Sequence, residues 1–155
     1  MIQNKKITIQ PLFEYRNLFK RVKVDKEPSV SNNIYFKSGR IALKFILDEI
    51  INNYKVKKIY IPYLICSEVI DILQTCNIQI FYYGINQNLT VNESLNKADI
   101  CEHTVVLFVN YFGLKDNSLF FKKIKEKRNC LLIEDNAHTL NNDDMEFVDF
   151  SFNSL

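Results

Sequence analysis

The segment 131–138 constrains the fold most strongly, because a short apolar run in it ends abruptly in two carboxylates. Three apolar residues at 131–133 are followed directly by Glu134 and Asp135, and His138 comes three residues later. An apolar run of this length is typical of a buried strand. In a doubly wound α/β sheet, ligands bind in the crevice at the carboxyl ends of the strands. We therefore expect Asp135 to lie at a ligand-binding crevice.

Short apolar runs alternate with helical patterns along most of the chain. Strands are predicted at 58–61, 78–83, 104–109, 130–134 and 147–152. Helices are predicted over 38–54, 67–75, 93–98 and 117–127, with Asn117 as the N-cap of the last one. The run at 104–109 is typical of a parallel strand that is covered on both faces. This alternation predicts an α/β fold with a mostly parallel sheet.

The N-terminal part of the chain has a different character. Residues 1–33 show no sustained hydrophobic period, so we predict an N-terminal arm that packs on another part of the protein, with a short helix around 13–19. The regular pattern begins at residue 34. The length of 155 residues leaves room for one domain with a substantial core. The predicted organisation is therefore an arm over 1–33 and a domain over 34–155.

Composition narrows the classes of function. The net charge is only +2, which gives no reason to expect binding to nucleic acid or to an anionic membrane. No apolar run approaches the roughly 18 residues of a membrane-spanning helix, and the N-terminus has no signal-type apolar core, so we predict a cytoplasmic protein.

The four cysteines are Cys66, Cys76, Cys101 and Cys130, without C-x-x-C spacing. Buried free thiols are predicted, with disulfides or a metal site as alternatives.

Several segments carry residues that suit a binding site. An isolated Asp135–His138 pair also fits a helix cap followed by a hydrogen-bonded histidine. The Ser-Gly-Arg at 38–40 precedes a long helix, whose free amides and dipole favour an anion, although a simple N-cap is the alternative. The Asn-Tyr-Phe-Gly at 110–113 and the Pro-Tyr-Leu-Ile-Cys at 62–66 each follow a predicted strand. All these segments are expected at the same edge of the sheet.

Taken in this order, the segments resemble the DegT/DnrJ/StrS family of pyridoxal-phosphate-dependent sugar aminotransferases. They are most similar to its branch with a P-x-x-x-C element and an S-G-R helix start. The resemblance extends from Tyr35 to Leu155 and is strongest at 111–113, 134–138 and 149–155. It implies a three-layer α/β fold, namely the N-terminal part of the large domain of the aspartate-aminotransferase type, and pyridoxal 5′-phosphate (PLP) as the cofactor. The region 34–155 would then be an incomplete large domain.

The resemblance also implies roles for individual residues. Asp135 matches the acid that pairs with the pyridinium nitrogen of the coenzyme and keeps its ring an electron sink. His138 stands where the family has Gln or His beside the ring and its phenolic oxygen. Gly39, Arg40 and Ile41 match the helix start whose amides bind the coenzyme phosphate.

Three further positions are implied less closely by the family pattern. Cys66 falls where many members place an aromatic residue that stacks on the coenzyme ring. Ser151 or Ser154 would supply the hydroxyl that many relatives use near the phosphate or the lysine. The pattern does not choose between these two serines.

One departure from the family concerns the catalytic lysine. In the family, the stretch matching 149–155 continues almost at once to the lysine that forms the Schiff base with the coenzyme. Leu155 is the last residue here, so no residue of this chain matches that lysine. Without it, no amine is positioned to move the proton between the substrate carbon and the coenzyme. We therefore expect a truncated, aminotransferase-like chain that binds the coenzyme weakly and is inactive by itself.

The resemblance assigns a reaction to the intact relative. As a homodimer, it would transfer an amino group from glutamate to a nucleotide-linked keto sugar in surface polysaccharide biosynthesis. A rival from another class is a non-catalytic α/β module that binds a partner protein or a ligand. A nucleotide-binding α/β domain ranks last, because the sequence contains neither G-x-G-x-x-G nor G-x-x-x-x-G-K-[ST].

Overall fold

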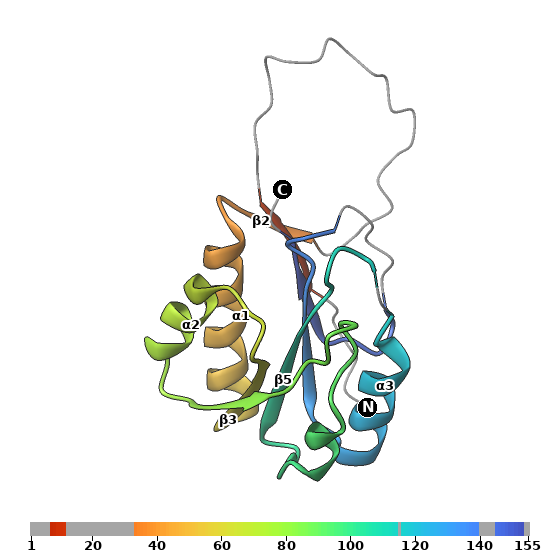
Figure 1. Cartoon of the computed structure of the whole chain (residues 1–155). Coiled ribbons are helices and arrows are strands. Elements are labelled where there is room, and N and C mark those ends of the chain that lie inside the picture. The colour runs from red at the N-terminus through yellow and green to blue at the C-terminus, as the bar shows by residue number, and fades with distance from the viewer. Residues whose placement is uncertain (1–6, 12–32, 115, 140–144, 154–155) are drawn as a thin grey trace.

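The computed structural model describes residues 7–11, 33–114, 116–139 and 145–153 (Figure 1). Its strands are β1 (Ile7–Pro11), β2 (Asn33–Phe36), β3 (Lys58–Pro62), β4 (Gln79–Tyr83), β5 (Thr104–Val109), β6 (Leu131–Asp135) and β7 (Phe150–Phe152). Its helices are α1 (Gly39–Tyr54), α2 (Ser67–Gln74), the 3-10 helix η1 (Glu93–Lys97) and α3 (Ser118–Arg128). The predicted alternation of strands and helices is confirmed, with the last strand shorter than expected.

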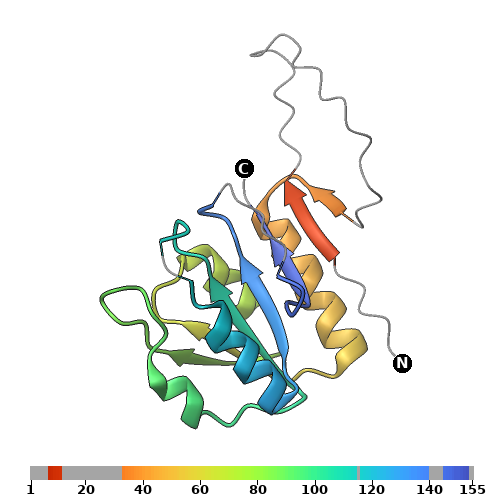
Figure 2. The ribbon, with the colours of Figure 1, turned by 90° about the vertical axis from the view of Figure 1, so that its right-hand side faces the viewer.

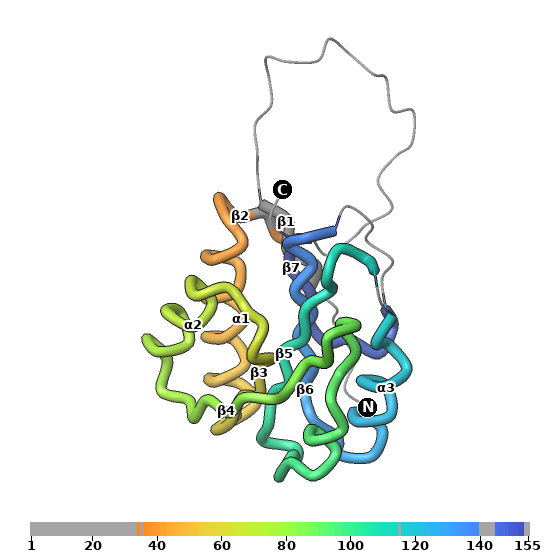
Figure 3. The backbone as a smooth tube through the Cα atoms, viewed as in Figure 1, coloured from red at the N-terminus to blue at the C-terminus, as the bar shows by residue number. Residues whose placement is uncertain are grey.

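The strands form one seven-stranded sheet in the order β2-β1-β7-β6-β5-β3-β4, and every neighbouring pair is parallel. Helices α1 and α2 cover one face of the sheet, and α3 covers the other (Figures 1 and 3). The result is the predicted three-layer α/β architecture. In the registers of the central strands, Asp135 of β6 pairs with Val109 of β5 and with Phe152 of β7. The carboxyl ends of these three strands are therefore level with one another.

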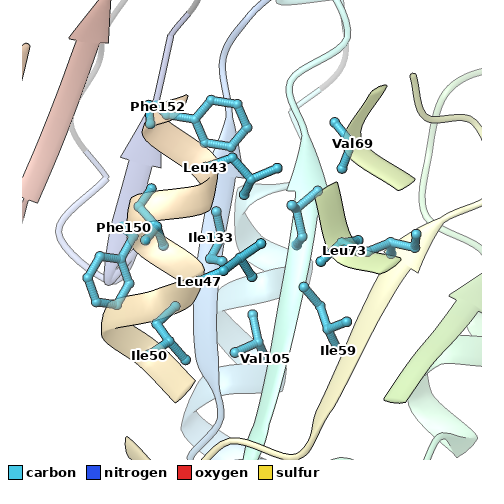
Figure 4. Close-up of a cluster of buried hydrophobic side chains, with 14 of the residues drawn as sticks. Leu43, Leu47, Ile50, Ile59, Val69, Leu73, Val105, Ile133, Phe150 and Phe152 are labelled. Carbon is cyan, nitrogen blue, oxygen red and sulfur yellow. The ribbon is translucent and has the colours of Figure 1, made fainter. Parts of the chain in front are cut away.

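The larger hydrophobic core lies between α1, α2 and the sheet (Figure 4). Leu47 of α1 and Leu73 of α2 are fully buried there, together with Val105 and Ile133 of the sheet. On the other face, Phe121 of α3 stacks on Phe108 of β5 with ring centroids 4.2 Å apart. β5 is buried along its whole length, as expected for a parallel strand covered on both faces.

Asn117 is the N-cap residue of α3, as predicted, but the helix start lacks the expected side-chain cap, because the Asn117 side chain makes no capping hydrogen bond. Instead its Oδ1 accepts from the Val91 amide at 3.2 Å, and its Nδ2 donates to the Leu89 carbonyl at 3.0 Å. At the helix start, a side-chain hydrogen bond comes from Asp116 instead, whose Oδ1 accepts from the Ser118 amide at 2.8 Å. Asn117 thus ties α3 to the loop after β4, because a tertiary partner competes for the same side chain.

The segment predicted as an N-terminal arm contains a strand of the sheet. β1 lies between β2 and β7 and pairs with both (Figure 2). The short helix predicted around 13–19 lies outside the described residues. The division of the chain at residue 33 stays a prediction.

The prediction of buried thiols holds only in part. All four cysteines are free, and Cys130 is buried, which raises its pKa to about 11. Cys76 is partly buried, whereas Cys66 and Cys101 are exposed. The prediction was wrong for these two because Cys66 precedes α2 and Cys101 lies in the turn before β5, outside the adjoining apolar runs.

Among the helices in the described ranges, none combines the length and the apolar character that a membrane crossing needs.

Two leucines test the packing of the helices on the sheet. Leu47 of α1 is fully buried, whereas Leu119 of α3 is 69% exposed. We expect Leu47→Ala to lower the free energy of unfolding by about 2–5 kcal/mol, because it leaves a cavity under α1. Leu119→Ala is the matched control and should change it by less than about 0.5 kcal/mol. Urea unfolding measures both, and equal effects would contradict the placement of α1.

Candidate functional site

A cavity of about 510 Å³ opens at the carboxyl ends of β5, β6 and β7, next to the starts of α1 and α2. Its lining includes six residues that were predicted to converge, namely Gly39, Arg40, Cys66, Tyr111, Asp135 and His138. The predicted convergence is therefore confirmed. The floor is apolar, because Leu43, Val69 and Phe152 belong both to the lining and to the core shown in Figure 4.

Asp135 is the buried charged group of this cavity. Only 6% of the residue is exposed, and its Oδ1 accepts a hydrogen bond from the Ala137 amide at 2.9 Å. Burial raises the pKa of Asp135, against smaller opposing effects of the Ala137 amide and of His138. None of the ion pairs between described residues involves Asp135. A protonated ring nitrogen in the cavity would compensate the buried charge, so the carboxylate suits such a group.

The start of α1 supplies the second polar element. Ser38 is the N-cap, and its hydroxyl accepts from the Ile41 amide at 3.4 Å. The first backbone bond of the helix runs from the Ala42 amide to the Ser38 carbonyl at 3.1 Å. The amides of Gly39 and Arg40 precede this bond and lie at the positive end of a 16-residue helix. This arrangement suits an anionic group such as a phosphate.

The start of α2 adds a cluster of three side chains at the same cavity. The thiol of Cys66 donates to Oε2 of Glu68 at 2.7 Å. The other oxygen of Glu68 lies 3.9 Å from Nη1 of Arg40. The pKa of Cys66 is raised, above all because the thiol donates to the Glu68 carboxylate. Glu68 was not among the predicted site residues, although its place next to the predicted helix start at residue 67 was a usable signal.

The loop after β5 closes another side of the cavity. The hydroxyl of Tyr111 donates to the Leu64 carbonyl at 2.6 Å, and burial raises its pKa well above the ordinary value. Phe112 and Gly113 both have positive φ, 57° and 69°, which turns the chain sharply here. The ring of Phe112 stacks on His138, with centroids 4.9 Å apart and planes 11° apart. The loop therefore fixes the histidine next to Asp135.

Two predicted residues, Ile41 and Ser151, are not among those that line the cavity, and a third is not described. The side chain of Ile41 is exposed and does not line it. Ser151 is buried in β7, where it pairs with Glu134 and not with Asp135. Side chains alternate between faces along a strand, so Ser151 shares the α3 face with Glu134, which lines a separate cavity of about 530 Å³. Ser154 lies outside the described residues.

Two kinds of group are absent from the described part of the site. None of the described residues that line the 510 Å³ cavity is a lysine. No group of three or more His, Cys, Asp or Glu in the described ranges is arranged to hold a metal ion. The cavity thus offers one buried carboxylate, one helix start with an arginine, and an imidazole. These groups fit an aromatic coenzyme that carries a basic ring nitrogen at one end and a phosphate at the other.

Comparison with known proteins gives matches at the level of structure. No protein-family model matches the sequence, and no curated protein matches it. The chain is similar to GDP-4-keto-6-deoxymannose-3-dehydratase, solved with a trapped PLP-glutamate geminal diamine, at 25% identity and a TM-score of 0.57. That match covers 65% of this chain and 28% of the dehydratase.

Two further solved structures are similar at 17% identity, which shows the fold alone. Helicobacter pylori PseC, an aminotransferase involved in pseudoaminic acid biosynthesis, matches with a TM-score of 0.58 over 69% of this chain and 30% of PseC. Spr1654 from Streptococcus pneumoniae, assigned as a sugar aminotransferase and solved in its PLP form, matches with a TM-score of 0.55 over 67% of this chain and 31% of Spr1654.

The matched structures define the class of fold. It is the α/β fold of PLP-dependent enzymes of the aspartate-aminotransferase type, and sugar aminotransferases are among the structural neighbours. The matched region spans between 28% and 31% of the length of the three proteins described above. The predicted fold class is thereby confirmed, and so is the resemblance to PLP-dependent enzymes.

The raised pKa of Asp135 predicts how its charge affects stability. The folded protein holds the Asp135 proton more tightly than the unfolded chain does, so ionisation of Asp135 opposes folding above the raised pKa. Asp135→Asn removes this charge and keeps the acceptor oxygen for Ala137. We expect the variant to be more stable than wild type to urea at pH 7. The difference should vanish below the ordinary pKa of about 3.9, where both forms of residue 135 are neutral.

The matched control for this experiment is Asp71→Asn, because Asp71 is exposed on α2. It should leave the free energy of unfolding unchanged at both pH values. A loss of stability at pH 7 in Asp135→Asn would show instead that the carboxylate has a cationic partner within the protein itself.

The contact between Cys66 and Glu68 predicts a change in thiol reactivity. Glu68→Gln removes the charged acceptor, so the pKa of Cys66 should fall toward its ordinary value. Because the thiolate is the reactive form, iodoacetamide should then label Cys66 about twofold faster or more at neutral pH. Peptide mapping measures the rate, with the exposed Cys101 as an internal control. An unchanged rate at Cys66 would contradict the contact.

Proposed function

We propose that this chain carries the coenzyme-binding part of a sugar-aminotransferase-like protein of the DegT/DnrJ/StrS family. The observation that carries the proposal is the meeting of a buried Asp135 and the start of α1 in one apolar-floored cavity. This meeting occurs in a fold that PLP-dependent enzymes share. The ordered motifs at 38–40, 111–113 and 134–138 support it from the sequence.

The residues have distinct proposed roles toward the coenzyme. Asp135 holds the proton on the ring nitrogen, because burial disfavours its charge more than the Ala137 amide and His138 favour it. When bound, the coenzyme supplies an electron sink for carbanionic chemistry at an amino substrate. Gly39 and Arg40 bind the phosphate through free amides at the helix start, and we place the backbone of Ile41 next to them.

In this proposal, His138 and Cys66 lie next to the coenzyme ring. His138 is held by its stack on Phe112 and lies beside Asp135 in the lining. Cys66 lines the same cavity, at the position where many relatives of the resembled family place a stacking ring. A thiol gives a smaller contact area than an aromatic ring, so noncovalent affinity should be correspondingly low.

The proposal extends to the whole protein of which such a domain is a part. Its reaction would be amino transfer from glutamate to a nucleotide-linked keto sugar in surface polysaccharide biosynthesis, carried out by a cytoplasmic homodimer. For this chain by itself we propose coenzyme binding without turnover, since none of the described cavity residues is a lysine. Ser154, outside the described residues, stays a candidate for the neighbourhood of the phosphate, whereas Ser151 lies on the other face.

A second candidate function rests on the rim of the cavity. Tyr63, Leu64 and Phe112 are large apolar side chains that are more than half exposed, and two of them line the mouth. A non-catalytic module that binds a partner protein would use such a rim. This candidate predicts no coenzyme binding, so the experiment below separates the two.

Calorimetric titration or equilibrium dialysis of the chain with vitamin B6 phosphates tests the proposal. We expect pyridoxal 5′-phosphate and pyridoxamine 5′-phosphate to bind with similar Kd, because no lysine of the described cavity anchors the aldehyde. Asp135→Asn should weaken both about tenfold or more, since a hydrogen bond between charged partners is lost. Asp71→Asn on exposed α2 is the control and should leave both Kd values unchanged.

Three outcomes would contradict the proposal. Absence of binding by the wild-type chain, or equal binding by wild type and Asp135→Asn, would remove the ring-nitrogen assignment. One stoichiometric pyridoxyl-lysine after borohydride treatment, together with amino transfer, would show a covalent site that the described cavity does not contain.

A further inference from the structure

Glu68 places a negative charge next to the helix start at which we propose that a phosphate binds. It lies in the first turn of α2 and lines the same cavity as Gly39 and Arg40, which are proposed to bind a phosphate. The described lining contains two carboxylates, Glu68 and Asp135. Asp135 suits a cationic ring nitrogen, but Glu68 is coupled to the arginine of the anion-binding helix start. A phosphate bound there would face the negative charge of Glu68.

The contacts of Glu68 resemble those that a ligand anion would make. One carboxylate oxygen lies 3.9 Å from the Arg40 guanidinium, and the other accepts from the Cys66 thiol at 2.7 Å. The side chains of Arg40 and Glu68 are 64% and 55% exposed. An ion pair this open to water is weak, so Arg40 can exchange one anion for another at little cost.

We propose that Glu68 is a specificity-determining residue that acts as an internal competitor of the ligand phosphate at the start of α1. In the structure its carboxylate forms an ion pair with Arg40. When a phosphate binds, Arg40 turns to the phosphate and Glu68 keeps the Cys66 contact. This inference rests on the proposed function, because it assumes that the phosphate binds at Gly39 and Arg40. It implies that Glu68 sets the affinity of the site for dianions and favours ligands that also satisfy Asp135.

Glu68 also has a structural role that the test must separate from competition. A carboxylate in the first turn of a helix stabilises that helix through its dipole. Glu68→Gln should therefore lower the stability of the protein slightly whether or not Glu68 competes with phosphate. If Glu68 only stabilised the helix, Glu68→Gln would not increase the affinity for a phosphate ligand, so ligand affinity separates the two roles.

The experiment compares ligands with and without phosphate. Pyridoxamine 5′-phosphate is the probe, and pyridoxamine is its phosphate-free match. We expect Glu68→Gln to tighten binding of pyridoxamine 5′-phosphate about threefold and to leave pyridoxamine unchanged. The gain should shrink at high salt, where exposed charges are screened. Glu126→Gln on α3 is the control and should change neither Kd.

A second variant tests the part played by Arg40. In an Arg40→Gln background, Glu68→Gln should tighten binding less than in the wild type, because only the direct repulsion is then relieved. Unchanged or weaker phosphate binding in Glu68→Gln, with the wild type binding normally, would overturn the competitor role and leave the proposed function intact. Failure of both wild type and Glu68→Gln to bind pyridoxamine 5′-phosphate would overturn the proposed function itself. Equal tightening of pyridoxamine would show a general effect on the cavity and would also overturn the competitor role.

Discussion

The parallel register of β5, β6 and β7 is the constraint on which the site depends. It sets Val109, Asp135 and Phe152 side by side at the ends of their strands. These strands are mostly buried between two helical layers, so the cavity opens only where the strands end. A slip of β6 by one residue would carry Asp135 to the α3 face and bring Glu134 to the cavity. The cavity is therefore specified by the same hydrophobic pattern that specifies the sheet.

Residues with a local signal were predictable from the sequence. The run 131–133 followed by Asp135 placed a carboxylate at a strand end, and the Ser-Gly-Arg at 38–40 placed a helix start near it. Parallel topology alone then gathers such residues at one edge of the sheet. That reasoning succeeded for the six residues that share the cavity, although they are spread over about 100 positions of the chain.

Features that depend on tertiary partners were not predictable in the same way. Asn117 has the right side chain and position for a cap, yet its amide is used by the 89–91 loop, which no local pattern reveals. Ser151 was placed near the site by the family resemblance, but strand alternation turns it to the α3 face once the pairing with Glu134 is known. β1 alternates apolar and polar residues only over a few positions, and its place between β2 and β7 follows from pairing with other strands.

The charges around the cavity favour a ligand that is itself dipolar. Asp135 is buried and its raised pKa records the cost of its charge, so a cation beside it is stabilising. The start of α1 is positive through its amides and Arg40, so an anion beside it is stabilising. A small neutral ligand would satisfy neither end, and a simple anion would satisfy one and be opposed by Glu68. A flat ring with a protonated nitrogen and a phosphate would satisfy both ends at once, so the charges of the cavity are complementary to such a molecule.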